Sequence, residues 1–321
     1  GLDIEMGTHA TSYNEYYLAA PFLELLKNGS VEQHYLDDKV RRILRTYYRT
    51  RLREDRPQGA FNTPDHQKVA RIVAEEGIVL LKNENNLLPL NREEIKSIAV
   101  IGDNATREHH SGGGSSAIKA LYEISPLEGL KNKVGDRIQI NYAKGYSSEE
   151  GIDVRQLYLD ALETARQSDH VIFCGGLSHK QDTEGQDKPD LKLPYGQAEL
   201  IQALLEINPS TIIVLVAGSP VEMEPWIKKA QAVVLAWYPG MEGGTALADI
   251  LFGDVNPSGK LPCTFPRKLA DSPAHALDAY PGKDGMVEYK EGIYIGYRYF
   301  DTFGVNPLFH FGHGLSYTTF D

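Results

Sequence analysis

Acidic side chains gather in one long polar segment of the chain, between Gly176 and Pro194. The segment contains four carboxylates, which alternate with lysines and a histidine along the sequence: Asp182, Glu184, Asp187 and Asp190. Carboxylic acids are common general acids and bases in catalysis. Loops are also polar simply because they face water. The residue types alone therefore leave two interpretations open, an acid–base site and a solvated surface loop.

The residues around this segment indicate how it is positioned. An apolar, β-branched run over residues 171–174 ends at Gly175 and Gly176, which predicts a buried strand followed by a turn. Pro194 predicts the start of the next helix. Long loops are uncommon in compact domains, and those that follow the carboxyl end of a parallel strand usually carry function. We therefore take the loop as the leading candidate site.

From Ser97 onward, short apolar runs alternate with amphipathic segments. The predicted strands are residues 97–101, 137–142, 170–174, 211–217 and 232–237. The predicted crossover helices are residues 125–132, 152–167, 196–207 and 244–252. Buried strands separated by helices predict an α/β fold with a mostly parallel sheet and helices on both faces, an α/β sandwich.

The part of the chain before residue 57 is predicted to be helical. Residues 13–27 form one amphipathic segment, and Ser30 is predicted to cap a second helix whose buried stripe is Leu36, Val40, Ile43, Leu44 and Tyr47. A polar stretch with Pro57 and Gly59 follows, which is typical of a linker. Thr63 and Pro64 then predict the start of a helix that continues to residue 81. The predicted domains are residues 1–57 and 58–321.

Composition excludes several classes of function. The 33 basic and 44 acidic residues give a net charge of −11, which disfavours nucleic acid and anionic membranes as partners. No apolar run approaches the length of a membrane span, and the chain does not open with a signal peptide. Cys174 and Cys263 lie far apart without ligand spacing, so we expect neither a disulfide framework nor a metal site. No cofactor is expected.

Several long motifs, in order, resemble glycoside hydrolase family 3. The loop sequence DTEGQDKPDLKLPYGQAELI is similar to the family's E-G-x-D-R segment followed by L-P-x-G-Q. Four further motifs match family signatures: VAEEGIVLLKNENNLLPL, GDVNPSGKLPCTFP, EYKEGIYIGYRYFD and PLFHFGHGLSYTTF. Together they cover almost the whole chain, which makes the resemblance far more specific than any single motif.

The resemblance implies an activity and assigns roles to residues of the loop. Family members such as β-glucosidases remove terminal non-reducing β-D-glucosyl residues with retention, and this loop carries their general acid/base. Glu184 is the matched position, with Asp182 as the alternative. The resemblance further suggests that Asp187, Lys188 and Tyr195 contact the substrate, although Lys188 stands where the family commonly has arginine.

Other family motifs are absent from the sequence. The S-D-W type motif of the nucleophile and the K-H-F-x-x-H type segment do not occur, whereas the opening GLDIEM resembles a phrase late in the family's barrel domain. We therefore expect residues 1–57 to be a helical remnant of a TIM-like barrel domain. The expected partners are an oligosaccharide or aryl β-glucoside and a barrel polypeptide that carries the nucleophile, and the option of a homo-oligomer stays open. The resemblance favours a periplasmic or extracellular location.

Alternative functions stay open on sequence alone. A β-xylosidase or another β-glycosidase of the family would share these motifs, and so would a noncatalytic carbohydrate-binding or structural fragment. The glycine run at residues 112–114 follows a predicted strand, as in nucleotide-binding proteins. It lacks both G-x-G-x-x-G after the strand and G-K-[ST] at its end, which disfavours a flavodoxin-like nucleotide binder.

Overall fold

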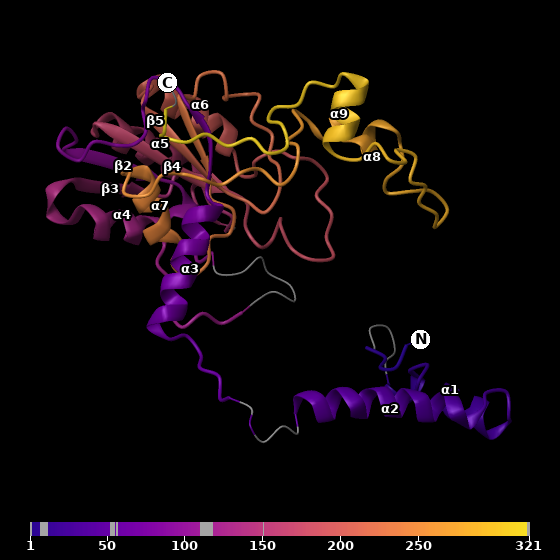
Figure 1. The fold of residues 1–321 in the computed structure, drawn as a ribbon. Helices are drawn as coiled ribbons and strands as arrows, with labels where there is room; N and C mark the ends of the chain where they lie inside the picture. Colours follow the sequence, from indigo (N-terminus) through magenta and orange to yellow (C-terminus); the bar gives the residue numbers. More distant parts are fainter. Residues whose placement is uncertain are drawn as a thin grey trace. The chain divides into compact units, whose positions relative to one another are not determined.

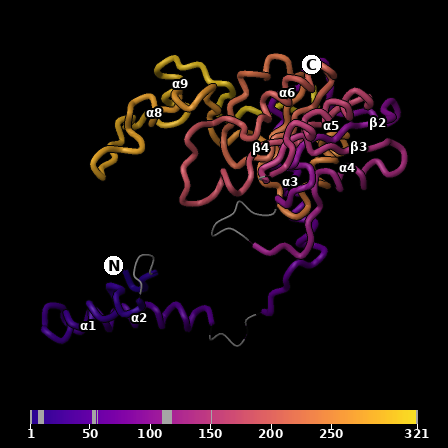
Figure 2. The backbone as a smooth tube through the Cα atoms, turned by 180° about the vertical axis from the view of Figure 1, so that it is seen from behind, coloured from indigo at the N-terminus to yellow at the C-terminus, as the bar shows by residue number. Residues whose placement is uncertain are grey.

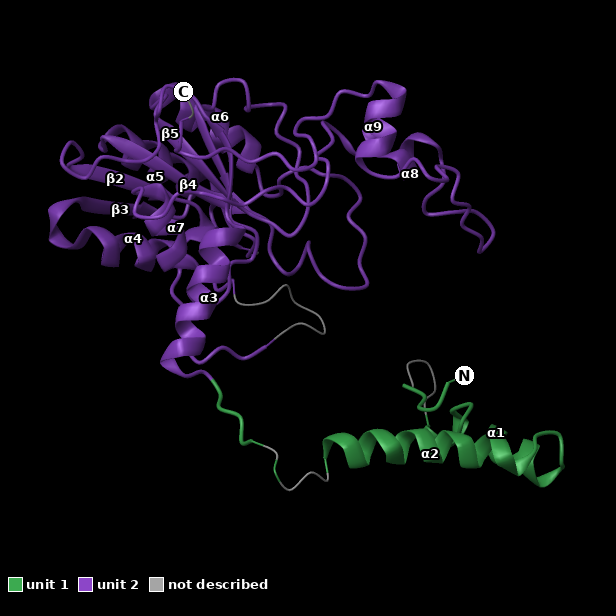
Figure 3. Cartoon of the chain, viewed as in Figure 1, with its two compact units in different colours: residues 1–61 green, residues 62–321 purple. Residues whose placement is uncertain are grey.

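The computed structural model describes residues 2–6, 12–51, 55, 57–109, 118–149 and 151–319 (Figure 1; Figure 2 gives the view from behind). The chain divides into two compact units, residues 1–61 and 62–321 (Figure 3). The assignment of residues 1–57 to a barrel domain stays a prediction. The glycine run at residues 112–114 lies outside the described residues.

Unit 1 consists of short helical elements. They are η1 (Tyr13–Glu15), α1 (Ala20–Lys27) and α2 (Gln33–Thr50). The predicted cap is wrong, because Glu32 and not Ser30 precedes α2, and Glu32 makes no capping bond. The stripe on α2 is also not buried: Val40, Ile43, Leu44 and Tyr47 are each exposed. Two helices without a packing layer cannot bury such a face, and no described residue of this unit is buried.

Unit 2 is built on a six-stranded sheet with the order β1-β6-β5-β4-β2-β3. The strands are β1 (Val79–Asn83), β2 (Ser97–Ile101), β3 (Gln139–Ala143), β4 (His170–Gly176), β5 (Thr211–Val216) and β6 (Ala232–Leu235). All neighbours pair in parallel except β1 and β6, which are antiparallel. The predicted α/β fold with a mostly parallel sheet is confirmed.

One strand was missed by the sequence analysis. The helix predicted to reach residue 81 ends at Gly77, and residues 79–83 form β1. Ile78 is fully buried and already extended, with φ −65° and ψ 132°. The apolar run after it is buried on both faces of the sheet, and a short fully buried run does not reveal its periodicity. Tertiary burial therefore decided between helix and strand.

Helices cover both faces of the sheet (Figures 1 and 2). The longer helices are α3 (Pro64–Gly77), α4 (Pro126–Val134), α5 (Val154–Arg166), α6 (Gln197–Ile207) and α7 (Gly243–Leu251). Residues of α5 and α6 share one apolar core with the sheet, and residues of α3, α4 and α7 share the other. Thr63 caps α3 and Pro64 begins it, as predicted. None of the helices described is long and apolar enough to cross a membrane.

The strand order places the candidate loop at a characteristic position. After β3 at the sheet edge, the chain returns to the opposite side of β2 and forms β4. The carboxyl ends of β2 and β4 therefore form the topological switch point, where open α/β sheets bind ligands. The loop over residues 177–196 starts at this end of β4. The fold thus presents the loop at the functional edge of the sheet.

The last part of the chain forms an extension and then returns to the sheet. The extension contains η5 (Leu269–Asp271), α8 (Pro273–Ala276) and α9 (Tyr297–Phe303). Beyond it, the Leu315 amide donates to the carbonyl oxygen of Leu80 at 2.8 Å. The His313 ring also bonds the Leu81 carbonyl at 2.8 Å. These contacts cover β1 at the edge of the sheet.

Candidate functional site

Asp182 is held firmly by the ends of two neighbouring strands. Its Oδ2 accepts a hydrogen bond from the Gly218 amide at 2.7 Å and another from the Tyr238 hydroxyl at 3.0 Å. Gly218 lies just beyond β5, and Tyr238 just beyond β6. The Asp182 side chain is only 19% exposed. The carboxylate therefore faces the domain, and one of its oxygens accepts both hydrogen bonds.

Lys188 follows Asp182 further along the same loop, and the two side chains lie beside each other. Its ammonium donates to Ser219 Oγ and lies 4.0 Å from Asp182 Oδ1. Burial lowers the pKa of Lys188, and the Asp182 carboxylate opposes that shift. The ammonium thus contacts two polar side chains of the protein, Ser219 and Asp182. Its predicted contact with the substrate stays a prediction.

Glu184 lies between these two residues on an exposed turn. Gly185 follows with φ +78°, a conformation that glycine adopts without strain, and a Cβ there would meet nothing within 4 Å. The turn consequently extends away from the domain. Of the two candidates for the acid/base, Glu184 is the one on the outward turn and Asp182 is the one bound inward.

The remaining predicted site residues lie elsewhere on the loop. Asp187 accepts a hydrogen bond from the Tyr280 hydroxyl, and the Tyr195 hydroxyl accepts one from the Gln181 amide. The predicted helix start at Pro194 is wrong, because α6 begins at Gln197. Tyr195 and Gly196 have φ of +61° and +71°, which an α-helix does not allow. Roles for Asp187 and Tyr195 in substrate binding stay predictions.

Gln197 fixes the far end of the loop to the strand from which it starts. The Gln197 side chain is fully buried, accepts from the Gly176 amide at 2.8 Å and donates to the Gly176 carbonyl at 2.8 Å. The two ends of the 177–196 loop are thereby held together at the end of β4. The sequence analysis did not assign this role to Gln197.

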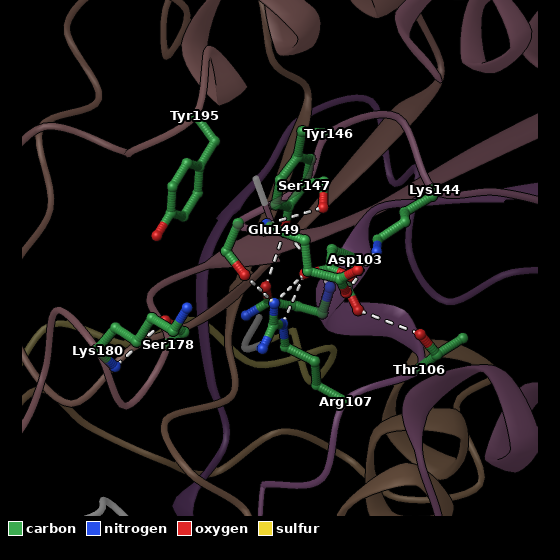
Figure 4. A network of polar contacts seen from close by, with 12 residues as sticks. Asp103, Thr106, Arg107, Lys144, Tyr146, Ser147, Glu149, Ser178, Lys180 and Tyr195 are labelled. Atoms are coloured by element: carbon green, nitrogen blue, oxygen red, sulfur yellow. Dashed lines mark hydrogen bonds and ion pairs between the residues drawn. The ribbon is translucent and has the colours of Figure 1, made fainter. Parts of the chain in front are cut away.

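A second polar network occupies the switch point between β2 and β4 (Figure 4). The Asp103 carboxylate accepts from Arg107 Nε at 2.7 Å and lies 3.4 Å from Lys144 Nζ. Asn104 donates to the Leu177 carbonyl at 3.0 Å and accepts from the Tyr146 hydroxyl at 2.8 Å. Polar side chains described at this point of the sheet thus bond to one another.

Tyr238 connects the loop with a buried histidine. Its ring centroid lies 5.5 Å from that of His179 and 6.4 Å from that of His109. Burial, and next the Asp182 carboxylate, raise the pKa of Tyr238 far above its usual value, so the hydroxyl stays a donor. Among the described residues, no group of three or more His, Cys, Asp and Glu side chains could hold a metal ion.

His109 should make the stability of unit 2 depend on pH. Burial lowers the pKa of His109 from 6.5 to about 4, and the hydrogen bond to the Asn104 carbonyl opposes the shift. Between pH 6.5 and about 4, the His109 ring therefore binds a proton in the unfolded chain but not in the folded one. The stabilisation is therefore complete above about pH 6.5, and is lost towards pH 4 at up to about 1.4 kcal/mol per pH unit.

Urea unfolding at several pH values measures this dependence. His109→Gln retains a donor for the Asn104 carbonyl but cannot titrate, so its unfolding free energy should fall less steeply between pH 6.5 and 4. Burial also lowers the pKa of His170, which contributes equally to both proteins. Equal slopes for the two proteins would show that His109 is not the titrating group.

Comparisons with known proteins agree on one family. The model of the glycosyl hydrolase family 3 C-terminal domain matches residues 78–297. The whole chain aligns with beta-glucosidase BoGH3A of Bacteroides ovatus at 44% identity and with thermostable beta-glucosidase B of Acetivibrio thermocellus at 40% identity. It covers 46% and 41% of these relatives, which is less than half of their length.

A solved structure gives the same result. The crystal structure of DesR, a beta-glucosidase from Streptomyces venezuelae in complex with D-glucose, matches with a TM-score of 0.90 and 28% sequence identity. The match covers 99% of this chain and 55% of that one.

Proposed function

Because the chain belongs to glycoside hydrolase family 3, we propose that it supplies the general acid/base of an enzyme that removes terminal non-reducing β-D-glucosyl residues with retention. The β-glucosidase names of its relatives support the substrate class. The exposure of the loop carboxylates supports the choice of residue. Glu184 is exposed, whereas the Asp182 side chain is only 19% exposed and accepts hydrogen bonds from Gly218 and Tyr238.

Retention requires two carboxyl groups roughly 5–5.5 Å apart. One attacks the anomeric carbon and forms a covalent glycosyl-enzyme intermediate. The other, here Glu184, first protonates the leaving oxygen and then removes a proton from the water that hydrolyses the intermediate. The negative charge of a nearby nucleophile would help such an acid to keep its proton.

We assign the nucleophile to polypeptide outside these 321 residues, called the barrel polypeptide below. Three observations support this assignment. The S-D-W type motif is absent from the sequence, and the chain aligns with less than half of its curated relatives. The exposed apolar stripe on α2, formed by Val40, Ile43, Leu44 and Tyr47, is surface of the kind that a partner covers.

Substrate contacts would come from the same loop. Asp187 and Tyr195 are exposed, and their polar groups can bond sugar hydroxyls or, for the Tyr195 ring, pack against an aglycone. The proposal involves no cofactor or metal, since the two carboxyl groups complete the reaction. A β-xylosidase would use the same groups, because the acid/base acts on the glycosidic oxygen and not on the sugar's C6 hydroxymethyl.

Proton NMR of the first product tests the proposal. The chain reconstituted with the barrel polypeptide should release the β-anomer of glucose from nitrophenyl β-D-glucoside before mutarotation produces the α-anomer. The matched substrate is nitrophenyl β-D-xyloside, and kcat/KM should be lower for it. Initial release of the α-anomer would refute retention, and a higher kcat/KM for the xyloside would establish the xylosidase alternative.

A further inference from the structure

We infer that Asp182 and Lys188 are positioning residues, which close the base of the turn at residues 183–187 and thereby fix the place of Glu184. The effect on catalysis rests on the function proposed above. The anchoring of the turn does not, because it follows from contacts within unit 2 alone. Neither residue needs to touch the substrate for this role.

The two residues are attached to adjacent positions of one backbone segment. Asp182 Oδ2 accepts from the Gly218 amide at 2.7 Å, and Lys188 Nζ donates to Ser219 Oγ. The two charged groups lie 4.0 Å apart, and each side chain is 19% exposed. Five residues separate Asp182 from Lys188 in sequence, so these contacts close a short turn that carries Glu184 near its middle.

The anchor is also closely packed. A Cβ added at Gly218 would lie 2.9 Å from Asp182 Oδ2 and 3.0 Å from Tyr238 Cε2, which is too near for either neighbour to keep its place. The Tyr238 hydroxyl donates the second hydrogen bond to Asp182 at 3.0 Å. The Asp182 carboxylate can thus approach this backbone segment only because residue 218 is a glycine.

Side-chain contacts hold the turn in place, and one of them outside its base is the hydrogen bond that Asp187 accepts from the Tyr280 hydroxyl. Residues 183–188 adopt no helix or strand, and Gly185 has the left-handed φ of +78°. An acid/base must stay within hydrogen-bond reach of the atoms that it protonates, and a misplacement of about 1 Å can cost about 10²-fold in rate. A turn closed at its base restricts Glu184 far more than an open loop of the same length would.

Trypsin cleavage of the 321-residue chain tests the anchoring without any activity assay. Lys180 precedes the turn and is followed by Gln181, whereas Lys188 is followed by Pro189, which blocks trypsin. Asp182→Ala should speed cleavage after Lys180 by about tenfold, since a charged hydrogen-bonded group is lost. Gly218→Ala should do the same without a change of charge. Asp190→Ala removes another carboxylate of this loop and should leave the rate unchanged.

Two outcomes decide the anchoring. Unchanged cleavage in both Asp182→Ala and Gly218→Ala would overturn the inference, and so would equal acceleration in Asp190→Ala. If a variant lowers the thermal midpoint of the whole domain, the gentler pair Asp182→Asn and Tyr238→Phe replaces it. Asp182→Asn removes the charge that faces Lys188 but retains an oxygen for Gly218 and Tyr238, and Tyr238→Phe removes one hydrogen bond. Both retain the shape of the side chain, so each should speed cleavage by a smaller factor than Asp182→Ala.

Assays of the reconstituted enzyme separate this inference from the proposed function. A positioning role predicts that Asp182→Ala and Lys188→Ala lower kcat and that azide does not restore it, because Glu184 is still present. Rescue of Asp182→Ala by azide would identify Asp182 as the acid/base and overturn the inference. Loosening of the turn together with an unaffected Glu184→Ala enzyme would instead reject the proposed function and leave the anchoring intact.

Discussion

Alone, the 321-residue chain is expected to hydrolyse nitrophenyl β-D-glucoside no faster than buffer does. A covalent glycosyl-enzyme intermediate needs a nucleophile, and the loop offers at most the other carboxyl group of the pair. General acid catalysis by itself contributes about 10²–10⁴-fold. Enzymes of this kind accelerate their reactions by about 10⁶-fold or more, so most of the acceleration should be absent.

Release of nitrophenol, followed before and after addition of the barrel polypeptide, measures this expectation. Addition should raise the rate by several orders of magnitude. The matched control adds the same barrel polypeptide to the Glu184→Ala chain, which separates catalysis by the assembled pair from activity of the barrel alone. Full activity of the unassisted chain would place the nucleophile within these 321 residues.

The sequence predicted the architecture where local pattern and tertiary role agree. Short β-branched runs at residues 97–101 and 211–216 are strands because each is too short for a buried helix and is bounded by turn residues. The prediction was wrong at residues 79–83. The apolar residues there follow helix α3 directly and were read as its continuation, although they form β1. Only the pairing of β1 with β6, some 150 residues later, decides its conformation.

The same limit applies to the site. The density of carboxylates identified the loop, and the family motif selected Glu184 within it. The sequence did not reveal which carboxylate is bound inward, because Gly218 and Tyr238 follow Asp182 by 36 and 56 residues. One signal was available: the carboxyl ends of neighbouring parallel strands meet at one edge, so residues just after β4, β5 and β6 had to be close together.

Glu184→Ala in the reconstituted enzyme should slow turnover of nitrophenyl β-D-glucoside by about 10²–10⁴-fold, the range typical of a lost general acid/base. Nitrophenolate leaves readily without a proton, so the first step should be affected little. The second step needs a base to activate water, and Glu184 is the proposed base. The glycosyl-enzyme intermediate should therefore accumulate, which a burst of nitrophenol followed by a slow steady state would reveal.

Azide distinguishes this role from any other function of the loop. As an anion it can attack the intermediate without a base, so it should restore the rate of Glu184→Ala and yield a β-glucosyl azide. The matched variants are Asp182→Ala and Glu291→Ala. Glu291 belongs to the EYKEGIYIGYRYFD motif and has one buried oxygen without a hydrogen-bond partner, which makes it the strongest competitor outside the loop. Rescue of Glu291→Ala but not of Glu184→Ala would transfer the acid/base role to Glu291.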